Sequence, residues 1–159
     1  MPNLPGIDRR VLSGLAIVVA LGVAALVYFL VIRDSGNPSC DEVTTFPVTQ
    51  LPVTPERYDE AIAGLQEVQR LTEQALTAEP EERTELLDEA FEVFYASSDN
   101  VMHDADFQLC EADYDFATLV RDDMLALEVA IGNQNNPQRI IELAEVLEQR
   151  MGEAKEILF

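Results

Sequence analysis

The sequence predicts an all-α protein in which one N-terminal transmembrane helix precedes an extracytoplasmic, antiparallel four-helix bundle. An uncharged apolar run occupies residues 11–32, and four later segments repeat apolar residues at spacings of three or four. Short connections join these four segments, which favours antiparallel neighbours. The expected organisation is a cytoplasmic N-terminus (1–10), a transmembrane helix (11–32), a Pro-containing extended linker (33–53) and an acidic four-helix bundle (54–159).

The apolar run at 11–32 is long enough to cross a membrane. At about 1.5 Å per residue it reaches about 33 Å, against a hydrocarbon core of about 30 Å. Arg9 and Arg10 precede the run, whereas the opposite charges of Arg33 and Asp34, which follow it, cancel. This excess of positive charge on one side predicts a cell-membrane protein with a cytoplasmic N-terminus and an exported C-terminal domain.

A cleaved signal peptide is the alternative interpretation of this run, because Val23, Ala24 and Ala25 satisfy the small-residue rule for a signal-peptide cleavage site. The apolar stretch continues beyond Ala25 to Ile32, and signal peptides usually have an apolar region of only about 7–15 residues. An uncleaved anchor is therefore favoured.

Small residues repeat every four positions within the run, at Ala16, Ala20 and Ala24. Such residues on one helix face allow close approach of another membrane helix. The other interpretation is that alanine is common in any membrane span. We expect this stripe to be a transmembrane packing face.

The linker contains several prolines and cannot be one continuous helix. It also carries apolar residues, which indicate an extended segment that lies against the bundle or a partner. These residues are Phe46, Val48, Leu51 and Val53.

The first bundle helix is expected from Thr54, as the N-cap, to about Ala78, and the second from Pro80 to Cys110, either unbroken or bent around Ser97 and Ser98. Apolar stripes predict their buried faces. The stripes are Tyr58, Ile62, Leu65, Val68, Thr72 and Ala75 in the first helix, and Leu87, Phe91, Phe94, Ser98, Val101, Ala105 and Leu109 in the second.

The third helix is expected to begin at a cap formed by Asp113 or Asp115 and to stop at Gly132 and Asn133. The fourth has Asn136 as the cap and Pro137 as its first residue. Their predicted stripes are Phe116, Leu119, Val120, Met124, Leu127 and Ile131, and then Ile140, Ala144, Leu147, Met151, Ala154 and Leu158.

Cys40 and Cys110 are the two cysteines, and both lie on the predicted exported side. An oxidising compartment favours a disulfide between them, while two free thiols are expected if the orientation is the reverse. A disulfide would hold Cys110 within about 25 Å of the bilayer surface, because Cys40 closely follows the membrane span.

The chain is strongly acidic, with 30 Asp and Glu against 10 Lys and Arg and a formal net charge of −20. This charge argues against nucleic acid and anionic lipid headgroups as ligands. It fits either a basic protein partner, such as a small soluble electron carrier, or adaptation to a salty environment. Both interpretations stay open from sequence.

Asp99, His103 and Asp106 fall on one stripe of the second helix at spacings of four and three. Carboxylate and imidazole ligands on one face suggest a partial site for a divalent metal ion. The simpler interpretation is a solvated acidic face with one ordinary histidine. The sequence has neither the paired Glu-x-x-His of di-metal bundles nor the Cys-x-x-Cys-His of c-type haem attachment.

These features predict a non-enzymatic, single-pass membrane accessory or scaffold subunit. Its acidic bundle is expected to bind or cover a protein partner in a larger membrane complex, with no resident cofactor. The alternative is a membrane-anchored module that binds a divalent metal ion. A weaker third hypothesis is an enzyme whose site is assembled only with a partner chain.

Overall fold

The computed structural model describes residues 39, 40, 49 and 51–159. In this part of the chain the regular structure is entirely helical. The elements are α3 (Pro55–Ala75), α4 (Pro80–Val93), the π-helical segment η1 (Phe94–Asp99), α5 (Asn100–Ala112), α6 (Tyr114–Asn133) and α7 (Pro137–Leu158). Because α4, η1 and α5 follow one another without a break, the described residues form four helical rods, which confirms a helical bundle.

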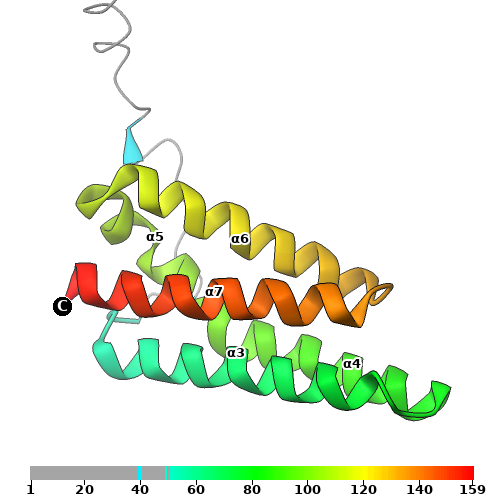
Figure 1. Ribbon diagram of the computed structural model, residues 1–159. Coiled ribbons are helices and arrows are strands. Elements are labelled where there is room, and N and C mark those ends of the chain that lie inside the picture. The colour runs from blue at the N-terminus through cyan, green and yellow to red at the C-terminus, as the bar shows by residue number, and fades with distance from the viewer. Residues whose placement is uncertain (1–38, 41–48, 50) are drawn as a thin grey trace, which may run out of the picture. The chain divides into compact units, whose positions relative to one another are not determined.

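The central pair of the bundle is α3 and α7, which lie side by side along most of their length (Figure 1). Lys155 near the end of α7 contacts Asp59 near the start of α3, and Glu148 contacts Gln69 further along. The two helices are therefore antiparallel. On this pair, α4 packs against α3 and α6 packs against α7.

Side-chain caps fix the starts of three helices. The Thr54 hydroxyl and the Asp113 and Asn136 side chains accept hydrogen bonds from backbone N–H groups three residues later. These starts confirm the predicted caps and select Asp113 over Asp115. The first helix ends at Ala75 and not at Ala78, while α6 ends at Asn133 and Gln134 adopts the left-handed conformation with φ 53°.

The core contains most of the predicted stripes, and the main exception is Leu119. This side chain is 46% exposed, because it lies on the side of α6 that faces away from the buried residues Val120 and Leu127. Other predicted core residues are only partly buried. They are Ile62, Phe91, Phe116 and Leu158.

The second rod changes direction through η1, so that α4 packs on α3 and α5 packs on α6. A π-helical turn holds an extra residue and rotates the helix face that follows it. Here the Ser98 hydroxyl donates to the Ala61 carbonyl at 2.7 Å. A Cβ on Gly64 would lie 1.9 Å from Ser97 Oγ, so only glycine permits this approach. The rod is thus unbroken, with a π-turn at the predicted bend.

The predicted membrane span at 11–32 lies outside the described residues, as does its stripe of Ala16, Ala20 and Ala24. Among the helices of the described part, none is both long and apolar enough to cross a bilayer.

We predict that Gly64→Ala destabilises the bundle. The added Cβ would also lie 2.7 Å from Ser97 Cβ, and rotation of the Ser97 side chain cannot relieve that clash. Overpacking of this kind costs about 1–3 kcal/mol of unfolding free energy. Chemical denaturation measures the change.

Gly152→Ala is the matched control, since a Cβ there meets nothing within 4 Å. It should raise the unfolding free energy by up to about 1 kcal/mol through helix propensity. Equal effects of the two substitutions would contradict the close contact between α3 and η1.

Candidate functional site

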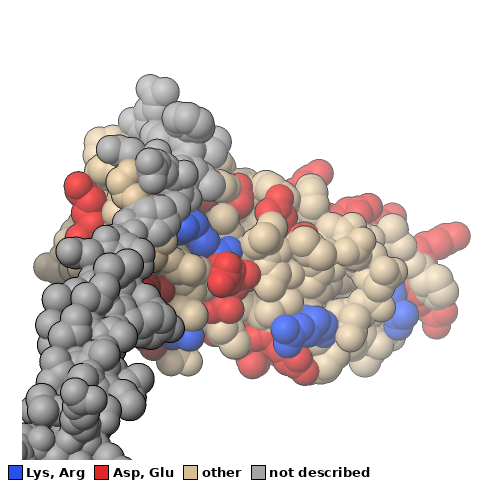
Figure 2. All heavy atoms as spheres, turned by 90° about the horizontal axis from the view of Figure 1, so that it is seen from above, with Lys and Arg blue, Asp and Glu red and all other residues tan. Residues whose placement is uncertain are grey.

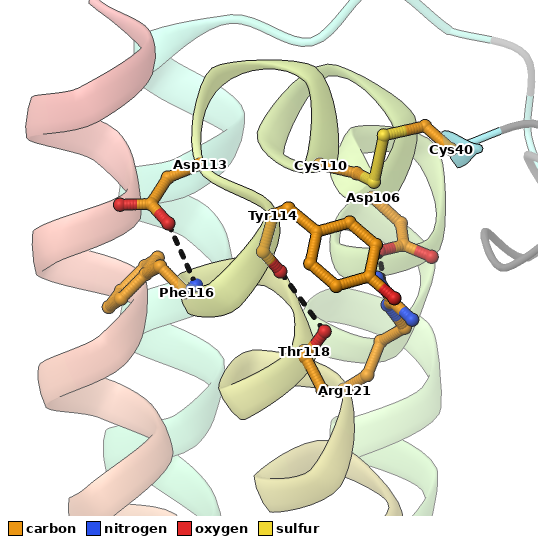
Figure 3. The surroundings of a disulfide bond; sticks show 8 residues. All are labelled: Cys40, Asp106, Cys110, Asp113, Tyr114, Phe116, Thr118 and Arg121. Atoms are coloured by element: carbon orange, nitrogen blue, oxygen red, sulfur yellow. Dashed lines mark hydrogen bonds and ion pairs between the residues drawn. A yellow bond between two sulfur atoms is a disulfide. The ribbon is translucent and has the colours of Figure 1, made fainter. Parts of the chain in front are cut away.

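The segment that precedes α3 is fastened to α5 by a disulfide. Cys40 and Cys110 are joined with an S–S distance of 2.08 Å and a Cα–Cα distance of 5.8 Å, which confirms the predicted pair (Figure 3). Cys110 lies in the last turn of α5, where it is 2% exposed.

A buried ion pair makes a second attachment to the same helix. The Asp104 side chain is 1% exposed, and its carboxylate accepts from the Arg57 guanidinium at 2.8 Å. It also accepts from the Thr49 backbone N–H at 3.0 Å and from the Thr49 hydroxyl. Arg57 donates further to the carbonyls of Leu51 and Pro52. The end of the linker therefore lies against the bundle.

These contacts set the protonation of Asp104. Burial acts to raise the pKa of this carboxyl, but the hydrogen bonds from Thr49 and Arg57 outweigh burial and hold the pKa below its ordinary value. The carboxylate is therefore charged at neutral pH. The sequence pattern does not predict that Asp104 is buried and paired, because its partners Arg57 and Thr49 lie 47 and 55 residues away in the sequence.

α5 is in turn fixed to α6. Asp106 on α5 accepts from the Arg121 Nε of α6 at 2.9 Å, beneath the disulfide (Figure 3). Asp113 forms the tight turn between the two helices and caps α6 through the Phe116 N–H at 2.9 Å. Three interactions thus fix this end of the bundle: the disulfide at Cys110, the ion pair of Asp106, and the helix cap formed by Asp113.

The predicted metal-binding stripe is divided between different partners. His103 Nε2 lies 3.4 Å from Asp99 Oδ1, whereas the Asp106 carboxylate is turned to Arg121. The hydrogen bond with Asp99 raises the pKa of His103 above its ordinary value, against the opposing effect of burial. Within the described ranges, no group of three His, Cys, Asp or Glu side chains could hold a metal ion. The geometry therefore gives the metal hypothesis no support.

A small cavity lies in the core beside this ion pair. Its volume is about 10 Å³, and its lining includes Tyr58, Asp106 and three methionines, Met102, Met124 and Met151. This is room for about one water molecule. Burial, and then the nearby Asp106 carboxylate, raise the pKa of Tyr58, so its hydroxyl stays protonated. All three methionines are buried, and their flexible side chains suit the irregular space around the cavity.

The outer surface of α6 and α7 carries an apolar area, which we call the α6–α7 face. Its exposed members are Leu125, Val129 and Val146, with exposed fractions of 56%, 54% and 42%. A shallow groove of about 550 Å³ runs between the two helices. The groove is lined by Asp122, Leu125, Ala126, Val129, Ala130, Arg139 and Leu143. The sequence pattern gives no sign of this area, because Leu125 and Val129 fall outside the apolar stripe of α6.

No known family model, curated protein or solved structure matches this chain.

We predict that Cys40→Ser lowers the unfolding free energy by about 4 kcal/mol. The disulfide closes a loop with a sequence separation of 70, and the chain-entropy model assigns a stabilisation of this size to such a loop. Thermal unfolding and non-reducing gel mobility of the full chain in detergent measure the effect. Cys110→Ser should behave identically, and unchanged mobility in both variants would argue against the bond.

We predict that Asp104→Asn costs about 3 kcal/mol at neutral pH, since removing one partner of a buried ion pair leaves the other uncompensated. A lowered folded-state pKa gives stability that is complete above the unfolded value of about 3.9 and is lost as pH falls through the folded value. The wild type should therefore lose the stability contributed by this carboxylate as the pH falls, whereas the variant has no carboxylate at position 104 to titrate; chemical denaturation at a series of pH values measures the difference.

Glu142→Gln is the matched control for Asp104→Asn. The pair of Arg139 and Glu142 is 54% and 52% exposed, so its removal should leave stability unchanged. If both variants lost the same unfolding free energy at neutral pH, the buried ion pair of Asp104 would stabilise the fold no more than an exposed one.

Proposed function

We propose that this protein is a non-enzymatic, single-pass membrane accessory or scaffold subunit. In this proposal residues 11–32 anchor the chain in the cell membrane, and the acidic helical bundle is exported and binds or covers a partner in a larger complex. The observation that carries the proposal is the double attachment of the chain to α5, at Cys110 and at Asp104.

The double attachment supports a positioning role. Residues 40 and 49 are both held on α5, so the segment that would lead from the anchor enters the bundle at a defined place. A freely jointed linker would let the bundle move far from the membrane, with an end-to-end distance that grows with linker length. Fixing residues 40 and 49 on α5 shortens the stretch that could vary in length between the proposed anchor and the bundle. That arrangement suits a subunit that must present one surface to a neighbour in the same membrane.

The charge and the exposed apolar area support a binding role for the bundle. Seen from above, a broad uncharged area lies between acidic groups and a few basic groups (Figure 2). Apolar surface rimmed by charge is typical of protein interaction sites. The formal net charge of −20 also favours encounter with a basic partner and disfavours anionic ones.

Gentle detergent extraction of the intact chain from its native membrane tests this proposal. We expect a particle larger than the monomer, with a second protein at a fixed ratio in quantitative mass spectrometry. A strictly monomeric particle without a second protein would contradict the proposal.

Two sets of substitutions within residues 11–32 sharpen that test. Ala16→Ile, Ala20→Ile and Ala24→Ile together add bulk to the predicted packing face and should release the partner. Val18→Ile with Ala25→Ile adds bulk about half a turn away on the same predicted helix and should not. Equal recovery in both sets would argue that this stripe does not contact another membrane helix.

A further inference from the structure

We propose that the α6–α7 face is a docking groove for one amphipathic helix of a partner protein, with Lys and Arg residues flanking that helix's apolar stripe. This inference rests on the proposed function, since it names the surface and the chemistry through which the bundle would bind its partner. The shape of the face, its exposed area and its charge each point to this occupant.

The apolar side chains of the face have the spacing that receives a helix. Leu125 and Val129 are four residues apart on α6 and are both more than half exposed, and Leu143 of the neighbouring helix α7 lines the same groove. Single exposed apolar residues are common, but a cluster on two adjacent helices marks a contact surface.

Small residues make the face concave. Ala126 and Ala130 are four residues apart on α6 and line the groove beside the larger Leu125 and Val129. Leu143, only 6% exposed, contributes from α7. A groove bounded by two helices, with an apolar lining, is the usual receptor for the apolar face of a third helix.

The charges around the groove argue for basic flanks on the incoming helix. Asp122 lines the groove, and Glu142 stands beside it on α7. Arg139 also lines the groove, but its guanidinium already donates to Glu142 at 3.2 Å. On the part of this side that grey atoms leave visible, acidic surface is more extensive than basic surface (Figure 2).

The same charge argues against a second copy of this chain as the occupant. Each copy carries a formal net charge of −20, so two copies would repel one another unless salt screened them. A partner helix with Lys and Arg flanks gains attraction from the same field.

The test compares three forms of the full chain, extracted from the native membrane under the same gentle conditions. In the groove variant, Leu125→Ser is combined with Val129→Ser. In the control variant, Leu76→Ser is combined with Ile157→Ser, which removes two exposed apolar side chains elsewhere. All three should unfold at the same temperature, since the four side chains are on the surface.

We expect the groove variant to recover at least tenfold less partner than the wild type, while the control variant recovers the wild-type amount. A photo-crosslinking residue at position 125 of the full chain should join a partner segment with apolar residues at spacings of three and four and flanking Lys or Arg. The same crosslinker at position 76 should not join that segment.

Three results would overturn the docking proposal while the proposed function stands. The groove variant keeps its partner; the crosslinked segment lacks Lys and Arg; or the crosslink joins a second copy or another part of the same chain. A wild-type chain that recovers no partner and gives no crosslink to another protein would overturn the proposed function as well.

Discussion

The buried ion pair between Asp104 and Arg57 is the contact on which the arrangement of the chain's entry depends. Arg57 stands in the first turn of α3, and Asp104 stands in α5, so the pair ties the start of one rod to the second half of another. Its carboxylate also holds Thr49 of the linker. A buried carboxylate without these donors would be costly, and the lowered pKa of Asp104 shows that the donors outweigh the burial. The disulfide at Cys110 then fixes the same helix a second time.

Much of the bundle follows from local chemistry, and for that reason the sequence predicts it. Thr54, Asp113 and Asn136 satisfy N–H groups within a few residues of themselves, so their helix starts need no tertiary information. The pairing of Cys40 with Cys110 is also within reach, because the chain has only two cysteines. The π-turn is different. It depends on the absence of a side chain at Gly64, more than 30 residues earlier, and no local pattern shows which helix will lie against Ser97.

The candidate surfaces could be predicted only in part, because they depend on which face of each helix finds a neighbour. Leu119 has the spacing of a core residue, yet α6 turns that side outward. Asp99, His103 and Asp106 share a stripe, but His103 pairs with Asp99, whereas Asp106 forms an ion pair with Arg121 of the next helix. Spacing along one helix therefore identifies candidate core and site residues, whereas contacts with the adjoining helix determine which of these residues are buried or paired.

The attachment and the proposed docking groove are connected through α6. Asp106 on α5 holds Arg121 in the second turn of α6, and Asp122 and Leu125 of the groove follow within the next turn of the same helix. A rigid helix transmits orientation along its length, so fixing its first turns also fixes where its later residues point. The contacts that hold residues 40 and 49 on α5 therefore act on the same helix as the ion pair that fixes the start of α6. A groove whose helix is already fixed loses less conformational freedom when a partner binds, which favours binding.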